Sequence, residues 1–135
     1  MNLVAMSIQR SFSPTTYKIS RYSPPLKHSG YERFLFSGSI RLPNPDQSAS
    51  SPKLPKARAL AVYFVVDEVT DLLPTPRFNF DTGEVVAYVH EREWSAWVDL
   101  VRNEKPLSVG VIYWSENLTT VDLSTGAESV GEGDG

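Results

Sequence analysis

Residues 59–66 read ALAVYFVV, the longest uninterrupted apolar run in the chain. A short run that is apolar at every position is typical of a strand covered on both of its faces. It is too short to cross a bilayer, which takes about 20 apolar residues in a helix. We therefore expect a central strand here, with the rest of the domain built around it.

The segments on either side of this run carry strand patterns of period two. Upstream, residues 31–42 alternate, so that Phe34, Phe36, Gly38, Ile40 and Leu42 are expected on the core face and Arg33, Ser37, Ser39 and Arg41 in solvent. Downstream, residues 77–80 and 84–90 predict a hairpin around Asp81-Thr82-Gly83, where glycine supplies the positive φ of a short turn.

A single amphipathic helix is predicted over residues 91–103. Trp94, Trp97, Val98 and Val101 follow the i, i+3, i+4, i+7 spacing of a helix that buries one side. At this spacing the two tryptophans either pack in the core or, if one is exposed, mark a protein interface. Two more strands are expected after the helix, at residues 107–115 and 119–123.

These elements predict a single α+β domain over residues 31–126, in which a mostly antiparallel sheet is packed by one helix. Residues 1–30 contain no acidic side chain, are rich in serine and include three prolines, so we expect an extended basic arm that orders only against something else. Residues 43–58 form a long proline-rich loop, a kind of segment that is usually functional or disordered. Residues 127–135 are expected to be an acidic flexible tail.

Composition excludes several classes of function. The chain of 135 residues has no cysteine and only two histidines, so disulfides, thiolate catalysis and cysteine-bound metals are excluded. We expect no cofactor and no metal site. No signal peptide and no membrane-spanning segment are recognisable, so a cytoplasmic protein without membrane association is expected.

Two short motifs carry weak catalytic or metal signals. Asp81-Thr82-Gly83 matches the string that holds the catalytic aspartate of retroviral-type aspartic proteases, which makes a small enzyme the second alternative. Since the triplet lies between two strand patterns, we interpret it as a hairpin turn and predict no catalytic residue. His90-Glu91 starts a zinc-binding pattern, but Trp94 stands where the second histidine would have to be.

Charge is distributed unevenly along the chain. Up to Leu60 there are nine lysines and arginines against two acidic residues, giving +7, whereas the remainder carries four against fourteen, giving −10. Such asymmetry favours an anionic partner for the first part of the chain, or pairing between the two parts. The candidate binding residues are the cations and interleaved aromatics of the basic part, namely Arg10, Phe12, Tyr17, Lys18, Arg21, Tyr22, Lys27, Arg33, Arg41, Lys53, Lys56 and Arg58.

Our hypothesis from the sequence is a non-catalytic accessory or assembly subunit. It would dock on a larger protein or ribonucleoprotein complex through the basic arm and the loop 43–58, which would order on that partner. The alternative is direct binding of single-stranded RNA or DNA, because lysine and arginine suit phosphates and aromatic rings suit bases. The sequence does not determine the oligomeric state.

Overall fold

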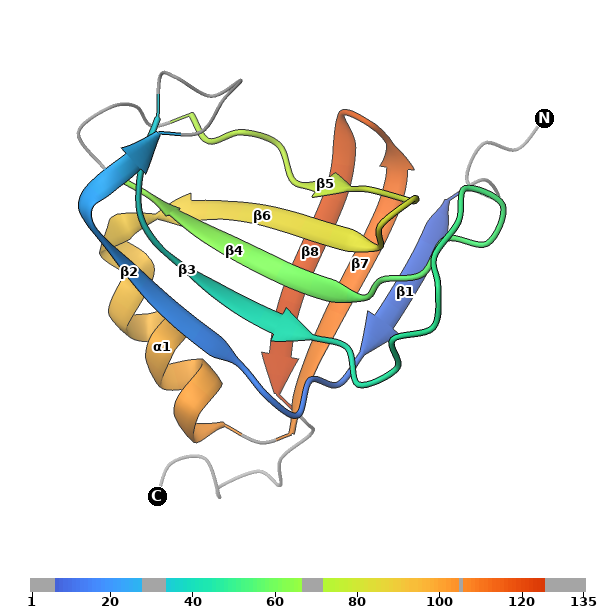
Figure 1. Ribbon diagram of the computed structural model, residues 1–135, viewed down its shortest axis with the longest axis horizontal. Helices are drawn as coiled ribbons and strands as arrows, with labels where there is room; N and C mark the ends of the chain where they lie inside the picture. Colours follow the sequence, from blue (N-terminus) through green and yellow to red (C-terminus); the bar gives the residue numbers. More distant parts are fainter. Residues whose placement is uncertain (1–6, 28–33, 67–71, 105, 126–135) are drawn as a thin grey trace.

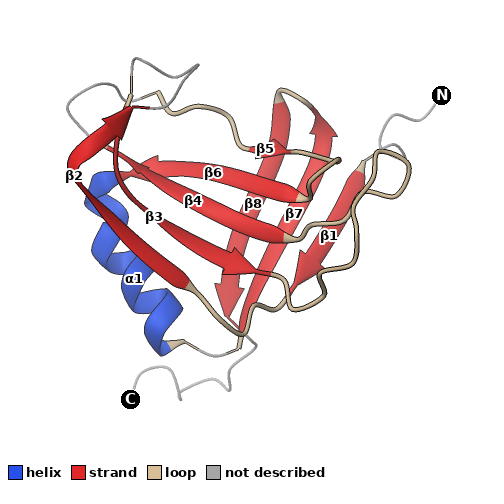
Figure 2. Cartoon of the chain, viewed as in Figure 1, coloured by secondary structure: helices blue, strands red, loops and turns tan. Residues whose placement is uncertain are grey.

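The computed structural model describes residues 7–27, 34–66, 72–104 and 106–125, which form two β-sheets and one short α-helix (Figures 1 and 2). The three-stranded sheet has the order β1 (Ile8–Phe12), β7 (Leu107–Ser115) and β8 (Leu118–Thr125). The five-stranded sheet has the order β2 (Lys18–Lys27), β3 (Leu35–Pro43), β4 (Ala59–Val65), β6 (Glu84–His90) and β5 (Arg77–Phe78). A 3-10 turn, η2 (Glu91–Glu93), leads directly into α1 (Trp94–Asn103).

The core lies between one face of the five-stranded sheet and a second layer made of the three-stranded sheet and α1. In Figure 1 the strands of the two sheets cross steeply, with α1 beside them. Fully buried side chains from both layers meet in this core, among them Ile40, Leu42, Leu60, Val62, Phe64, Val85, Val109 and Val111. Burying each such side chain contributes about 1.5–3 kcal/mol, which makes this interior the main source of stability.

The apolar run 59–66 is the central strand that its composition predicts. β4 pairs antiparallel with β3 and parallel with β6, so it has a neighbour on each side. Its two faces have different surroundings. Leu60, Val62 and Phe64 face the core, whereas Ala59, Ala61, Tyr63 and Val65 alternate onto the other face of the sheet.

The predicted α+β class is confirmed, but the single, mostly antiparallel sheet is replaced by two sheets, and one pair in the larger sheet is parallel. The parallel pair arises because β5 pairs with the outer edge of β6. After β4 the chain first forms β5 at the edge of the sheet. It then turns back as β6, which fills the position between β5 and β4. No local pattern of residues reports this crossover, because it depends on which strand edges meet.

The residues expected to form an extended arm are strands instead. β1 pairs with β7 and β2 pairs with β3, and Phe12 and Ile19 pack into the core. β1 pairs with a strand far along the chain, whereas β2 pairs with the next strand but carries Pro24 and Pro25 at the edge of the sheet, which disguise it as a strand. Residues 1–6 and 28–30 of the expected arm, and the expected tail 127–135, lie outside the described residues.

The spacing in the sequence predicts that Phe36 shares a face with Ile40 and Leu42, but in the structure it does not. A register shift between Phe36 and Gly38 inserts an extra residue into β3, which turns Phe36 to the opposite face of the sheet. There its ring contacts Tyr63 and Tyr88. The shift matters for function because it adds an aromatic ring to the outer face of the five-stranded sheet.

The remaining predicted elements are found, namely the hairpin of β5 and β6, the helix, β7 and β8. Gly83 has a φ of 79° in the hairpin turn, the conformation expected of it. The half-buried tryptophans pack on the core, since the rings of Trp94 and Trp97 lie 4.7 and 6.5 Å from the ring of Phe64.

Gly38 is required by the close contact between β2, β3 and α1. A Cβ atom at this position would lie 2.6 Å from the Ser20 carbonyl oxygen and 2.8 Å from Cζ3 of Trp94. We predict that Gly38→Ala lowers the free energy of unfolding by about 1–3 kcal/mol, as overpacking in a core does. Urea denaturation followed by tryptophan fluorescence measures the change.

Gly110→Ala is the matched control. Its Cβ would meet only the carboxylate of Asp122, an exposed side chain that can rotate away. We expect this variant to stay within about 0.5 kcal/mol of the wild type, the usual range for surface substitutions. Equal losses in the two variants would contradict the packing described for Gly38.

Candidate docking surfaces

Polar and aromatic side chains from four strands meet on the face of the five-stranded sheet that points away from the core, which we call the outer face. Lys18, Tyr22, Ser39, Arg41, Tyr63, Glu84 and Tyr88 belong to it, and they come from β2, β3, β4 and β6. Directly paired residues share a face of a sheet, which places Tyr63 opposite Tyr88 and Lys18 opposite Arg41. Lys18, Tyr22 and Arg41 were predicted as binding residues from the sequence.

Two polar contacts order the outer face. The hydroxyl groups of Tyr22 and Ser39 are 2.7 Å apart and share a hydrogen bond. Arg41 donates to Glu84 with a distance of 2.9 Å and forms an ion pair at 2.6 Å. The hydrogen bond to Glu84 raises the pKa of the Arg41 guanidinium, against the opposing effect of burial. Because both side chains are exposed, the pair orients the guanidinium more than it stabilises the fold.

Three aromatic rings form a cluster on this face. The rings of Tyr63 and Tyr88 lie 6.1 Å apart and 28° from parallel, and Phe36 contacts both from the bulge in β3. Tyr63 and Tyr88 are half-buried. Neither tyrosine is among the binding residues predicted from the sequence. The signal that could have found them is the register of two neighbouring strands, which sequence alone does not supply.

The long loop 43–58 has a defined conformation that its own polar groups maintain. Asn44 donates to the carbonyl of Ala57 at 2.8 Å, and Gln47 donates to the carbonyls of Asn44 and Arg58. Ser50 donates to the carbonyl of Phe80 and accepts from the backbone of Lys56, which ties the loop to the β5–β6 hairpin. The loop therefore does not need a partner to order it, contrary to the expectation from its length and prolines.

Three cations of β1 and the loop donate to neutral oxygens. Arg10 donates through Nε to the carbonyl of Pro55 at 2.7 Å, and Lys56 donates to the hydroxyl of Ser48 at 2.8 Å. Arg58 lies 3.4 Å from the side-chain oxygen of Gln47. Arg41–Glu84 is the one ion pair found between described residues, so Arg10, Lys53, Lys56 and Arg58 form no ion pair there. Lys56 still lies near enough to Asp46 to help lower the pKa of that carboxyl.

The other predicted binding residues are scattered over the molecule. Arg21 lies on the core side of β2, with its guanidinium 4.5 Å from the centre of the Trp94 ring. Phe12 is buried in the core and unavailable to a ligand, which corrects its inclusion among the binding residues. Tyr17 and Lys27 are exposed near the two ends of β2, and Arg33 lies outside the described residues.

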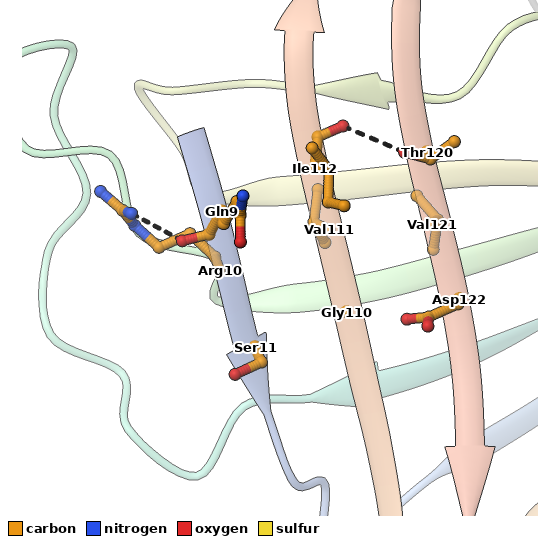
Figure 3. A pocket seen from close by; sticks show the side chains of 9 residues that line it. All are labelled: Gln9, Arg10, Ser11, Gly110, Val111, Ile112, Thr120, Val121 and Asp122. Carbon is orange, nitrogen blue, oxygen red and sulfur yellow. Dashed lines mark hydrogen bonds between the residues drawn. The ribbon is translucent and has the colours of Figure 1, made fainter. Parts of the chain in front are cut away.

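A shallow hollow of about 580 Å³ lies on the three-stranded sheet, on the face turned away from the core (Figure 3). Gly110 leaves space at the centre of β7, and the carboxylate of Asp122 reaches over it from β8. Ser11 and Gln9 border the hollow from β1. Asp122 and Arg10 are the charged residues of its lining, and Arg10 donates its guanidinium N–H groups to the carbonyls of Pro55 and Gln9.

Asp81 belongs to the turn between β5 and β6. The side chain of Asn79 accepts hydrogen bonds from the backbone of Asp81 and Thr82, and Gly83 donates to the Asn79 carbonyl, so the triplet forms the predicted turn. Asp81 is exposed. Within the described ranges, no three histidine or acidic side chains are grouped as a metal site would need, and no helix is long and apolar enough to cross a membrane.

Comparisons with known proteins provide no further guide to function. No family model, no curated protein and no solved structure matches this chain. The function must therefore be argued from the surfaces described above.

Burial raises the pKa of the Tyr63 hydroxyl above its ordinary value of 10.0, and the nearby Tyr22 and Glu84 raise it further while Arg41 lowers it. The folded state thus holds this proton more tightly than the unfolded state. Stability should therefore fall as the pH rises through about 10, where Tyr63 ionises in the unfolded chain. We predict a smaller alkaline loss in Tyr63→Phe, measured as the urea midpoint between pH 8 and 11.

Tyr17→Phe is the control for this titration, because Tyr17 is 45% exposed. It should retain the alkaline loss of the wild type. A loss in Tyr63→Phe as large as that of the wild type would contradict the environment described for Tyr63.

Proposed function

We propose that the protein is a non-catalytic accessory subunit that docks on a larger protein or nucleoprotein complex through the basic loop 43–58 and the adjoining strands. The observation that carries this proposal is the state of the loop's cations. Lys53 is exposed and Lys56 is bonded only to a neutral hydroxyl, while hydrogen bonds hold the loop in one conformation. Charged groups held on an ordered loop lose little conformational entropy on binding, which favours association.

The surroundings of the loop also support docking rather than catalysis. Leu54, between the two lysines, is 60% exposed, and an exposed apolar side chain flanked by charges is a common feature of protein contacts. Asp46 is the acidic residue of the loop, and its carboxylate accepts a hydrogen bond from the backbone of Ser48. Electrostatic attraction to an acidic partner would increase the rate of association.

The test uses a tagged full-length chain, purified under native conditions from its own cells, with the mass of the eluted complex measured. We expect the wild type to elute in an assembly larger than its own 15.1 kDa. The double variant Lys53→Glu/Lys56→Glu should elute mainly as the free chain. Arg92→Glu, which makes the same kind of charge change at an exposed site on η2, should behave as the wild type.

The proposal fails if the wild type elutes as the free chain, or if the double variant stays in the assembly as fully as Arg92→Glu does. Absorbance at 260 and 280 nm of the same fractions shows whether the assembly contains nucleic acid. This second reading separates a protein complex from a nucleoprotein complex.

Direct binding of single-stranded RNA or DNA is a second candidate, favoured by the outer face of the five-stranded sheet. There Tyr63, whose ring stacks with that of Tyr88, lies on the strand next to that of Arg41, and Lys18 stands opposite Arg41. Aromatic rings beside cations suit bases and phosphates, respectively. The acidic Glu84 on this face is paired with Arg41.

For this candidate we expect a labelled 15-nucleotide poly(dT) or poly(U) strand to bind at low salt, with an affinity that falls steeply as salt rises. Tyr88→Ala should weaken binding by about 1–3 kcal/mol, the range for loss of one base stack. Trp114→Ala removes an exposed ring from the other sheet and should have no effect. Fluorescence anisotropy provides the measurement, and no binding even at low salt would exclude the candidate.

A further inference from the structure

A groove of about 300 Å³ separates β1 from the loop 43–58. Arg10 and Ser11 line it from β1, and Asp46, Leu54, Pro55 and Lys56 line it from the loop. The loop runs beside β1 in Figure 1, although the two are more than thirty residues apart in the sequence. The groove thus has a strand on one side and an ordered loop on the other.

The strand side of the groove is an unpaired sheet edge. β1 is the outer strand of its sheet and pairs only with β7 among the described residues. Every second residue of an outer strand turns its N–H and C=O away from the sheet, where they can pair with an added strand. An extended peptide that enters the groove can therefore bind through backbone hydrogen bonds, as in other cases of strand addition.

The loop side is already in place before any ligand binds. The bond from Arg10 Nε to the Pro55 carbonyl connects the two walls, and the Asn44 and Ser50 bonds maintain the loop behind them. Leu54 offers an apolar contact at the rim, where it is 60% exposed. Because little needs to be ordered on binding, a short peptide is sufficient as a ligand.

The charge of the groove favours an acidic peptide. Arg10 donates hydrogen bonds from Nε to the carbonyl of Pro55 and from Nη1 to the carbonyl of Gln9. Its guanidinium has further N–H groups that a carboxylate can accept from. Lys56 contributes a second cation, and Lys53 lies nearby in the loop. Asp46 opposes them with one negative charge, because hydrogen bonds from Ser48 and the nearby Lys56 lower its pKa and keep it ionised. Arg10, Lys53 and Lys56 nevertheless outnumber it. Positive charge therefore predominates.

We propose that this groove binds an extended acidic segment of a partner polypeptide, which adds to β1 as a further strand. One of its carboxylates would lie between Arg10 and Lys56, and an apolar side chain would cover Leu54. This inference rests on the proposed function and specifies the partner's chemistry. The groove has no aromatic side chain in its lining, so it lacks the base-stacking surface that a nucleic acid would use.

The test uses the full chain and a fluorescein-labelled dodecapeptide of alternating glutamate and threonine with one central leucine. Anisotropy should show saturable binding, and the same peptide with lysine in place of glutamate should bind at least tenfold more weakly. We expect Lys56→Glu to weaken binding of the acidic peptide at least tenfold. Lys53→Glu changes an exposed side chain that makes no described bond. It should weaken binding of the acidic peptide by a smaller factor. This second variant keeps the test valid if Lys56→Glu does not fold.

Arg92→Glu is again the matched control and should bind the acidic peptide as the wild type does. Strand addition has its own readout, because amide hydrogen exchange in β1 should slow when the peptide binds, while exchange in β8 should not change. Absence of saturable binding, equal binding of the lysine peptide, or equal losses in Lys56→Glu and Arg92→Glu would overturn the inference. So would a poly(dT) strand that competes for the groove with equal affinity.

Failure of this inference can be told apart from failure of the proposed function. If the acidic peptide does not bind but Lys53→Glu/Lys56→Glu still releases the chain from its native assembly, the loop docks on a partner of other chemistry and only the groove assignment is wrong. If the double variant also remains fully assembled, both are wrong.

Discussion

The structure depends on the burial of β4 from both faces. One face of this strand contributes Leu60, Val62 and Phe64 to the core, and the other carries Tyr63 among the side chains of the outer face. Because β4 pairs with β3 on one side and β6 on the other, it fixes where both neighbours lie. The loop 43–58 begins at the end of β3 and returns to the start of β4, so this pairing also fixes the loop's two ends.

The two sides of the molecule serve different purposes as a consequence. The core side is closed by α1 and the three-stranded sheet, where Phe64 meets Trp94 and Trp97. On the other side, Lys18 on the outer face and Lys53, Lys56 and Arg58 in the loop form no ion pair with a described carboxylate, whereas Arg41 pairs with Glu84. In the function proposed above, these charged and aromatic groups would contact a partner from a rigid support.

The loop illustrates how polar residues can replace a hydrophobic core locally. Asn44, Gln47 and Ser50 bond to backbone groups that would otherwise lack partners within the chain. Prolines reduce the number of conformations that must be lost when these bonds form. The same composition that suggests disorder in a sequence therefore produces order once hairpin and loop lie within reach of each other.

Elements with strong local periodicity could be predicted from the sequence, and those defined by distant partners could not. The run 59–66, the hairpin turn at Gly83 and the tryptophan spacing of α1 determine their own conformation, because their patterns match one type of element. The strands β1 and β2, the parallel pairing of β4 with β6, and the reversal of Phe36 were decided by tertiary structure. Strand edges pair with whatever segment the folded chain brings beside them, and no local pattern records that. The charge asymmetry was visible in the sequence, but only the folded chain places Arg10 beside Lys56 and Tyr63 beside Tyr88.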